Sequence, residues 1–508
     1  MDIDGIVKSL LANRGITSAD LFFHPPHPQD IPSPFKSNPA IKLIRKHIKL
    51  QHPIAIYGDY DVDGICSTAI LWETLYSKYK NVFPHIPHRE EEGYGLSLKG
   101  IDHCLSKNAK LIIAVDNGIT AIEQTKYCLE KSCDLIIIDH HELGKQLPKP
   151  NILLHSTSAC AAGLTWLFCR DFMGSPNLEN LSLAAIATIC DMIPLLETNR
   201  SIAKYGLESL NQTTRPGLLS LFYEARIRLG SIGTYGVGFI IGPRLNAMGR
   251  LEHAIDSLRL LCTSSPTRAK ELAQTLNSTN LQRQTETQIS VTHALQQTAV
   301  NNILLAASTS YHSGIIGLIA AKLVENYYRP SIAISIGEEV SKGSGRSITG
   351  FHLTDFLRTH EELFINLGGH AMACGFTIST AKIDDLAKVL ATAQIDEKLL
   401  VKKQRIDLEI PLSIVNYQLS TALAQFEPFG LGNPSPVFQS TGQISDIKPV
   451  GRESKHIKFK VDGLDAIWFN ATSSLEPRTH NLTYSLSKDT WNGQDKLQLV
   501  IKDVQQSS

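Results

Sequence analysis

The sequence IAIYGDYDVDGICSTA, residues 54–69, indicates the fold of the first half of the chain. A short apolar run is followed by a turn that carries three aspartates, and then by small residues typical of a closely packed helix. A buried β-forming run that leads into a helix is typical of a parallel sheet whose strands are connected by helices. We therefore expect a strand at 54–57 and a helix at 66–79.

Two further runs repeat this pattern. LIIAV at 111–115 precedes a helix that extends through residue 128, and LIII follows at 135–138. The alternation predicts an α/β domain in which helices cover both faces of a parallel sheet. Ligands of such sheets bind beyond the carboxyl ends of the strands. Since Asp59, Asp116 and Asp139 lie at or just after these ends, we expect them to meet at one edge.

The segment GDYDVDG at 58–64 carries Asp59, Asp61 and Asp63. At alternate positions of an extended loop, the three carboxylates project to the same side. They repel one another unless cations lie between them, so the segment predicts a metal site. The start of the next helix also offers backbone N–H groups to a phosphate. The simpler alternative is an acidic surface turn.

Three more segments complete a candidate site: VDNG at 115–118, DHH at 139–141 and CDMIP at 190–194. We expect Asp116 to bridge two metals, and one of His140 and His141 to bind a metal while the other faces a substrate phosphate. Asp139 then orients an imidazole, and Asp191 is the last ligand. The alternatives are a common turn for VDNG, structural histidines for DHH, and a helix or turn cap for Asp191. Two adjacent divalent metals are a usual means of cleaving a phosphoester with water.

Composition limits the classes of function. Lys+Arg and Asp+Glu number 49 each among 508 residues, so nucleic-acid binding must depend on local patches. At this length about two to four domains are expected. The nine cysteines are scattered without a CxxC, which indicates reduced thiols. The first residues are acidic where a signal peptide is basic, and no apolar run approaches the roughly 20 residues of a membrane span. We expect a cytoplasmic protein that does not bind membranes.

The remaining chain changes character several times. We expect a helix at 38–50, after a Pro-rich extended stretch at 24–35, and mostly helix at 196–300 with a glycine-rich interruption at 230–249. A second α/β unit follows, with strands at 303–308 and 331–336, glycine-rich loops at 342–347 and 368–375, and a helix at 382–393. After residue 402, short alternating runs such as HIKFKV and KLQLVI predict a small β-barrel.

The four acidic segments together resemble those of the DHH phosphoesterase superfamily. Further segments, in the same order, resemble the RecJ single-strand-specific exonuclease family from residue 10 to 503. They are EGYGLS (92–97), GPRLNAMGRLEHA (242–254), YHSGIIGLIAAKL (311–323), GSGRSITGFHL (343–353), GGHAMACGF (368–376) and FEPFGLGNPSPVF (426–438).

This resemblance implies an N-terminal lead-in (1–50), a DHH domain (51–200), a helical connector (201–300), a DHHA1 domain (301–398) and an OB-fold barrel (399–508). It also implies 5′→3′ degradation of single-stranded DNA in recombination and repair, with Mn²⁺ or Mg²⁺ as cofactor.

The resemblance also implies roles for individual residues. The chemistry is expected at Asp116, Asp139 and His141. The two-metal site corresponds to Asp59, Asp61, Asp63, Asp116, His140 and Asp191. The substrate contacts correspond to Arg89, Tyr94, His141, Arg244, Asn246, His312, Ser344, Arg346 and His370. Tyr311 stands where the family has Trp, which leaves stacking at that position open.

Several of these residues suit strand binding on chemical grounds alone. Arg244 and Arg346 can each grip two phosphate oxygens, and His370 follows two glycines in a loop that can approach a ligand closely. Tyr94, between two glycines, can stack on a base. The alternatives are surface arginines, a packed histidine and an exposed turn tyrosine.

The predicted barrel carries a local excess of basic residues near aromatic side chains. This excess predicts a cationic groove with aromatics, and the alternative is a solvated face over core aromatics. The basic residues are Lys448, Arg452, Lys455, Lys458 and Lys460, and the aromatics are Phe459, Trp468 and Trp491.

Two other functions are consistent with the motifs. One is a different DHH activity: hydrolysis of nano-RNA, cyclic dinucleotides or pyrophosphate. A strand-binding barrel argues against it, since such small substrates need no extended surface. The other is an inactive scaffold in a replication complex, which the complete set of expected ligands argues against. A helicase or single-strand-binding protein as partner, and a monomeric state, are expectations that no residue pattern tests.

Overall fold

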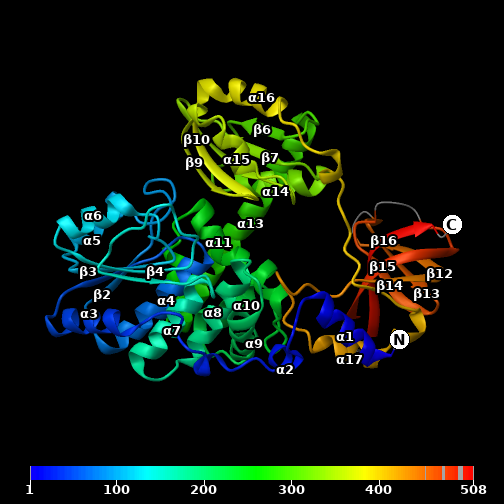
Figure 1. The fold of residues 1–508 in the computed structure, drawn as a ribbon, viewed down its shortest axis with the longest axis horizontal. Helices are drawn as coiled ribbons and strands as arrows, with labels where there is room; N and C mark the ends of the chain where they lie inside the picture. The colour runs from blue at the N-terminus through cyan, green and yellow to red at the C-terminus, as the bar shows by residue number, and fades with distance from the viewer. Residues whose placement is uncertain (1, 452–453, 472–474, 490–495, 507–508) are drawn as a thin grey trace.

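The computed structural model describes residues 2–451, 454–471, 475–489 and 496–506. An α/β domain, a helical region, a second α/β domain and a β-barrel follow one another along the chain (Figure 1). Within these described ranges, no helix is both long and apolar enough to cross a membrane.

The first sheet is wholly parallel, with strand order β2-β1-β3-β4-β5. The strands are β1 Ile54–Tyr57, β2 Val82–His85, β3 Leu111–Val115, β4 Asp134–Asp139 and β5 Ile152–His155. One face packs on α3 Asn38–Lys49, α4 Val62–Lys78, α7 Ala161–Met173 and α8 Leu178–Cys190, and the other on α5 Leu98–Ser106 and α6 Ile122–Glu130. The α/β prediction is confirmed; the edge strands β2 and β5 were not predicted.

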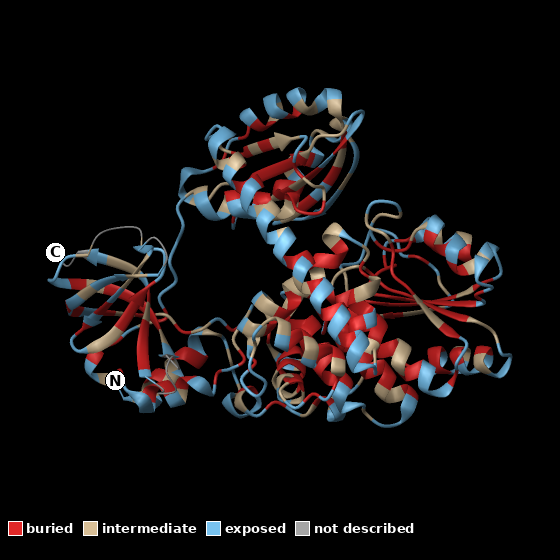
Figure 2. Ribbon diagram, turned by 180° about the vertical axis from the view of Figure 1, so that it is seen from behind, coloured by how far each residue is buried: buried red, intermediate tan, exposed pale blue. Residues whose placement is uncertain are grey.

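The hydrophobic core under this sheet continues into the helical region. Figure 2 shows buried residues filling the sheet and the helices beside it. The region comprises α9 Glu197–Leu210, α10 Pro216–Glu224, the π-helix η2 Gly236–Ile241, α11 Gly242–Leu251, α12 Ile255–Cys262 and α13 Pro266–Gln297.

The predicted glycine-rich interruption at 230–249 is wrong over most of its length, because η2 and α11 are helical there. The glycines serve close packing instead. A Cβ on Gly242 would overlap the Cys190 sulfur, and one on Gly249 would overlap the Tyr60 carbonyl oxygen.

The second α/β domain has strand order β6-β7-β8-β10-β9, with only the β6–β7 pair parallel. Its elements are β6 Leu304–Ser308, α14 Ile316–Tyr327, β7 Ser331–Ser335, β8 Val340–Arg346, α15 Leu353–Arg358, β9 Phe364–His370, β10 Ala373–Ser379 and α16 Ile383–Ala391. The two predicted glycine-rich loops are therefore largely strands. Glycine is needed at Gly343 because a Cβ there would overlap the Phe376 ring.

The C-terminal barrel has strand order β11-β12-β13-β14-β16-β15 and is closed by a β12–β15 pairing. The strands are β11 Leu408–Glu409, β12 Phe438–Val450, β13 His456–Val461, β14 Leu464–Trp468, β15 Thr479–Asp489 and β16 Lys496–Gln506. The first helix, α1 Ile3–Asn13, shares the core of this barrel, so the N-terminal end of the chain packs on the C-terminal domain.

The basic face of the barrel lacks two of its predicted aromatics. Phe459 and Trp468 are 3% and 4% exposed, so they are core residues, and the groove interpretation is wrong for them. Lys448 lies opposite Lys458 in the β12–β13 pair, which leaves a basic strip on the surface. Arg452 and Trp491 lie outside the described residues.

Arg200 of α9 connects the helical region to the barrel. Its side chain is 1% exposed and donates hydrogen bonds to the carbonyl oxygens of Phe22, Phe426 and Glu427. Because these carbonyls belong to the N-terminal segment and to the segment leading into the barrel, one buried guanidinium joins three distant parts of the chain.

Candidate active site

The β1–α4 loop carries the first acids. Asp59 is fully buried, and Asp61 caps α4 by accepting hydrogen bonds from the backbone N–H groups of Asp63 (2.9 Å) and Gly64 (3.1 Å). A Cβ on Gly64 would lie 2.5 Å from the Asp59 nitrogen, so the loop can fold back on the helix only with glycine there. Asp63 lies in the first helical turn, not on an extended loop as predicted.

The amide side chain of Asn246 also contacts this helix start. Its Oδ1 accepts a hydrogen bond of 3.1 Å from the Val62 N–H. With Asp61 capping the next N–H groups, the predicted phosphate site at this helix start is wrong. The structure shows Asn246 holding α11 against the loop that carries the acids.

Asp63 is held by a second helix. Its two carboxylate oxygens accept hydrogen bonds from the backbone N–H groups of Ala161 (2.8 Å) and Ala162 (2.7 Å), at the start of α7. A helix N-terminus stabilises a carboxylate, so Asp63 is oriented before any cation arrives.

Asp116 follows β3 in the left-handed backbone region, at φ 64°. The next residue fixes this turn, because the Asn117 side chain donates hydrogen bonds to the carbonyl oxygens of Gly58 (3.1 Å) and Val115 (2.9 Å). Asn117 thus ties the ends of β1 and β3 together, a role that the pattern VDNG alone did not reveal.

Asp139 at the end of β4 orients the histidine pair. Its Oδ1 accepts hydrogen bonds from the His140 N–H (2.8 Å), the His141 N–H (3.2 Å) and His141 Nδ1 (2.7 Å), and its Oδ2 accepts one from the Ile119 N–H (2.9 Å). The imidazole that Asp139 orients is therefore that of His141, which leaves His140 to face the acids.

His140 lies at the centre of the carboxylates. Its Nε2 is 3.3 Å from an Asp116 oxygen, 3.5 Å from an Asp63 oxygen and 3.6 Å from an Asp191 oxygen. Asp191 directly follows α8, which is buried over most of its length. The start of α4 (Asp63), the turn after β3 (Asp116), the end of β4 (His140) and the end of α8 (Asp191) thus meet at one point.

The candidate ligand atoms form overlapping groups in which all atoms lie within 4.8 Å of one another. The groups are Asp59, Asp61 and Asp116; Asp63, His140 and Asp191; and Asp116, His140 and His141. Asp116 and His140 each belong to two groups. The groups therefore lie next to one another, as two adjacent divalent cations would require.

These atoms fit a divalent cation because several are buried without a partner. Both oxygens of Asp59, Oδ1 of Asp116, Nε2 of His140 and Oδ2 of Asp191 have no hydrogen-bond partner among the described residues. A buried unsatisfied polar group costs about 1–3 kcal/mol, and more if it is charged. Carboxylates with one imidazole suit Mn²⁺ and Mg²⁺.

The pKa values of these residues also indicate a site that lacks a cation. Burial, followed by the charges of neighbouring carboxylates, raises the pKa values of Asp59 and Asp116, and raises that of Asp191 to about 8. Burial lowers the pKa of His140. The protein alone therefore disfavours the charged carboxylates that a cation would stabilise.

The pKa of His141 is shifted in the opposite direction to that of His140. Burial opposes its protonation, but the hydrogen bond to Asp139 and the surrounding carboxylates outweigh burial and raise the pKa of His141 to about 9. Its Nε2 lies 2.9 Å from the Tyr94 hydroxyl. The hydrogen bond to Asp139 therefore favours the protonated form of this imidazole.

A cluster of arginines lies next to the acids, at the junction with the second α/β domain. Arg89 stacks on Tyr60 at 4.2 Å and donates a hydrogen bond of 2.9 Å to the Gly249 carbonyl oxygen. Arg250 donates one of 3.0 Å to the carbonyl oxygen of Gly314 in the second domain. Burial, together with the charges of Arg89 and Arg346 among others, lowers the pKa of Arg250 to about 10.

Arg346 completes this arginine cluster (Arg89, Arg250, Arg346) from β8. Its guanidinium donates hydrogen bonds to the Ser344 hydroxyl (3.1 Å) and to the Gly345 carbonyl oxygen (2.8 Å). Ser344 therefore orients Arg346. Sequence reasoning missed Arg250, although it lies in the quoted segment at 242–254 where Arg244 was chosen instead.

The structure separates some of the other predicted residues from this cluster. Arg244 bonds Asn277 of α13 and the Ile240 carbonyl oxygen, near the opposite end of α11 from Arg250. Tyr311 is 2% exposed and its hydroxyl bonds His293. It is a core residue, which excludes it as an exposed stacking surface.

Two histidines of the second domain lie at the domain junction. His370 Nδ1 lies 3.5 Å from a carboxylate oxygen of Glu142, the residue that follows His141. His312 Nδ1 accepts a hydrogen bond of 3.0 Å from the Gly314 N–H, in the loop that Arg250 contacts. Both therefore lie near the segments that carry the acids and the arginine cluster.

Comparisons with known proteins agree with this layout. Sequence profiles match at 53–189 (DHH family, N-terminal domain), 299–394 (DHHA1 domain) and 406–503 (RecJ OB domain). The single-stranded-DNA-specific exonuclease RecJ of Bacillus subtilis (strain 168) is 33% identical over 99% of this chain and 68% of its own. The protein of that name from Thermus thermophilus is 31% identical over 89% of this chain and 68% of its own.

A solved structure matches almost the whole chain. The crystal structure of RecJ in complex with Mn²⁺ from Thermus thermophilus has a TM-score of 0.88 at 26% identity, covering 99% of this chain and 76% of that one. Because the match extends over both α/β domains and the barrel, and not over the acidic motifs alone, this chain belongs to the RecJ family of single-stranded-DNA-specific exonucleases.

Proposed function

We propose that this protein is a metal-dependent exonuclease that removes nucleotides from the 5′ end of single-stranded DNA, in recombination and repair. One observation carries the proposal: buried carboxylates without hydrogen-bond partners among the described residues lie beside the cluster of Arg89, Arg250 and Arg346. The first group suits cations that activate water, and the second suits a phosphate. The relatives named above carry the name of such an enzyme.

The residues that we propose to hold two divalent ions are Asp59, Asp61, Asp63, Asp116, His140 and Asp191. When bound, two such ions lower the pKa of water and stabilise charge on the attacking and leaving oxygens. The contribution of the protein is orientation: Asp63 is set by the start of α7, and Asp116 by the turn that Asn117 holds. Carboxylates placed in advance need no rearrangement during the reaction.

His141 supplies a positive charge to the reacting phosphate. Asp139 keeps its Nδ1 protonated and fixes the ring, while Nε2 lies toward Tyr94 and the open side of the site. We propose that the Nε2–H donates to a nonbridging phosphate oxygen after the Tyr94 hydroxyl yields to substrate. Tyr94 is 58% exposed, so it is free to stack on a base.

Recognition of an end is assigned to the arginine cluster, with His370 and His312 beside it. A terminal phosphate carries close to two negative charges near neutral pH, whereas an internal diester carries one. Like charges held together, as in Arg89, Arg250 and Arg346, favour the more highly charged group. A strand end is thereby distinguished from the middle of a strand.

The test is digestion of long single strands labelled at the 5′ or the 3′ end, with Mn²⁺ or with EDTA. We expect the 5′ label to appear at once as a mononucleotide, only with Mn²⁺, while the 3′-labelled strand shortens progressively. An Asp116→Asn variant should bind the strand without cutting it. Faster turnover of a dinucleotide than of the long strand would instead indicate a small-substrate DHH activity.

The cellular context is part of the proposal. Single-stranded DNA arises when duplexes are unwound, so a helicase or a single-strand-binding protein is the expected partner. We propose a cytoplasmic monomer. Sedimentation of the purified chain tests its oligomeric state.

A further inference from the structure

An aromatic pair stands on the surface beside the acids and has no role in the proposed chemistry. Tyr235 and Phe239 are 69% and 70% exposed, and their rings stack with centroids 5.0 Å apart and planes 25° apart. Contiguous exposed apolar surface marks interaction sites, whereas single exposed side chains are ordinary, and these two rings are contiguous. Phe239 lies in the π-helix η2, a rare element that is frequent at functional sites.

The helix η2 packs directly on the end of α8 that leads to Asp191. The Cys190 thiol lies 3.8 Å from the Val237 carbonyl oxygen, and a Cβ on Gly238 would be 3.8 Å from Ile189. Met192, directly after Asp191, is 66% exposed. The aromatic pair is thus one packing layer away from a proposed metal ligand.

The helix α11 connects the arginine cluster, the loop of acids and η2 in one line of contacts. At its C-terminal end lies Arg250 of the arginine cluster, in its middle Asn246 bonds the loop of acids, and at its start Gly242 meets Cys190. A strand laid along α11 with its terminal phosphate at Arg250 passes the acids and then reaches η2.

We infer that Tyr235 and Phe239 form a stacking platform for bases of the uncut strand beyond the metal site; this inference rests on the proposed exonuclease function. Stacking on aromatics holds single strands without regard to sequence, which suits an enzyme that must accept every base. Arg244, whose guanidinium lies against the Ile240 carbonyl oxygen at the end of η2, supplies a cation for the backbone.

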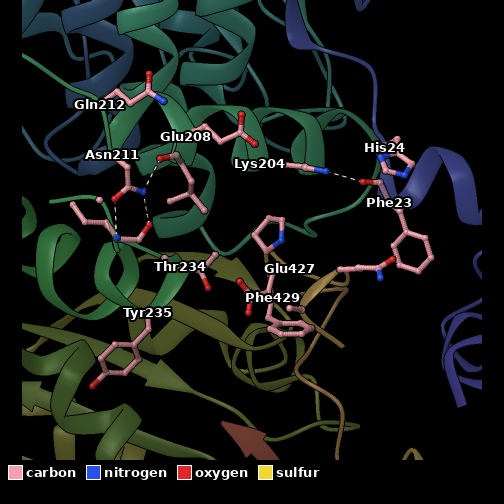
Figure 3. A pocket seen from close by; sticks show the side chains of 17 residues that line it. Phe23, His24, Lys204, Glu208, Asn211, Gln212, Thr234, Tyr235, Glu427 and Phe429 are labelled. Carbon is pink, nitrogen blue, oxygen red and sulfur yellow. Dashed lines mark hydrogen bonds between the residues drawn. The ribbon is translucent and has the colours of Figure 1, made fainter. Parts of the chain in front are cut away.

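The neighbouring cavity defines which side of the pair the strand uses. Tyr235 lines a cavity of about 760 Å³ whose lining also includes Glu427 and Phe429 (Figure 3). Its walls carry two carboxylates, Glu208 and Glu427, against one ammonium, that of Lys204, which already donates a hydrogen bond to the Phe23 carbonyl oxygen. We therefore place the strand across the exposed ring faces and not inside the cavity.

The spacing predicts which bases stack. From Phe239 to Arg250 the chain rises about 16 Å, at 1.5 Å per residue. A stacked strand advances about 3.4 Å per nucleotide, so the platform lies at most about five nucleotides from the bound end, and fewer if the strand is extended. Bases at roughly the third to fifth positions should stack.

The test is a Tyr235→Ala/Phe239→Ala double variant, measured on a 5′-phosphorylated 20-mer and on a dinucleotide. We expect kcat/KM for the 20-mer, divided by kcat/KM for the dinucleotide, to fall about 5- to 150-fold. This range is the loss of stacking of one base, converted at tenfold per 1.4 kcal/mol. Tyr76→Ala is the matched control. It removes one ring of another stacked pair, with Trp72 on α4, away from this path, and should leave the ratio unchanged.

A second readout needs no turnover. With 2-aminopurine placed at single positions of the strand, the Asp116→Asn protein should show the largest fluorescence change near the third to fifth bases, and the added double substitution should abolish it. An unchanged ratio together with an unchanged profile overturns the platform, as does a change in oligomeric state caused by the double variant. Absence of Mn²⁺-dependent nucleotide release by the unmodified protein would overturn the nuclease assignment separately.

Discussion

Replacing Asp139 by Asn tests whether a protonated His141 serves the reaction. The Asp139 carboxylate accepts three hydrogen bonds on Oδ1 and one on Oδ2. An Asn side chain keeps the three bonds only by turning its NH₂ group toward the Ile119 N–H. The Ile119 N–H then faces a second donor and has no acceptor, and each unsatisfied donor costs about 1–3 kcal/mol of stability.

The larger effect is on the charge of His141. Its pKa is raised from 6.5 to about 9, and at about 1.4 kcal/mol per unit this is at most about 3 kcal/mol in favour of the imidazolium. Other carboxylates share in that rise, so Asp139 supplies a part of it. Without the Asp139 charge the pKa of His141 falls, so a larger fraction of the ring is neutral at pH 8 than in the unmodified protein. We expect kcat/KM on single-stranded DNA to fall about 10- to 100-fold, as for other residues that orient groups at metal sites.

The assay compares nucleotide release by Asp139→Asn and unmodified protein between pH 6 and pH 8.5, with Mn²⁺ affinity measured by calorimetry. The activity of the variant relative to the unmodified protein should rise as pH falls, because acid restores the His141 proton. Mn²⁺ affinity should change little. The matched control is Asp134→Asn, which removes the Asp134–His47 pair (2.9 Å) at the other end of β4. A relative activity that does not vary with pH would refute the reasoning.

Three further predictions follow from the same geometry. Arg346→Ala should weaken binding of 5′-phosphorylated strands about 10-fold or more relative to strands with a blocked end, measured by anisotropy; an equal loss for both would contradict its role. Because the folded pKa of Asp191 is about 8 and its ordinary value is 3.8, the metal-free protein loses stability as pH rises from the lower value to the higher one, by up to about 1.4 kcal/mol per unit. The gap in Tm between Mn²⁺-loaded and metal-free protein should therefore widen from pH 5.5 to 8.5, and a constant gap would argue against it. Gly249→Ala adds a Cβ that overlaps the Tyr60 carbonyl oxygen and should cost about 1–3 kcal/mol together with most activity, whereas Gly233→Ala, which meets nothing within 4 Å, should be nearly neutral in thermal unfolding and turnover.

The central strands were predictable because burial on both faces leaves a continuous apolar run. β1 and β3 match their predicted bounds. The edge strands β2 (VFPH) and β5 (ILLH) are short, and β2 contains a proline, so local propensity does not mark them. Their place is decided by pairing with a central strand, which local propensity does not report.

The glycine-rich segments show the main limit of local interpretation. Glycine usually indicates a turn, but Gly343 lies in a strand and Gly249 in a helix, each where another element leaves no room for a side chain. Such crowding depends on tertiary packing. The same limit explains Arg250, whose partners in space, Arg89 and Arg346, are distant in the chain and come from two different domains.

The acids were predictable for a different reason: the ends of parallel strands converge, so residues at those ends meet whatever separates them in sequence. The arginine cluster was not predictable, because no comparable rule of sheet geometry predicts that α11 lies against the second domain. The two groups are each costly alone, since buried like charges repel. In the protein without ligands, the negative charge of Asp61 already stabilises the positive charge of Arg250, so the acids and the arginines offset part of each other's cost. Cations bound by the acids and a phosphate bound by the arginines would offset the rest. The phosphate of a strand end can contact the cations as well as the arginines. Metal and strand should therefore bind cooperatively, and a domain junction that opens would weaken both at once.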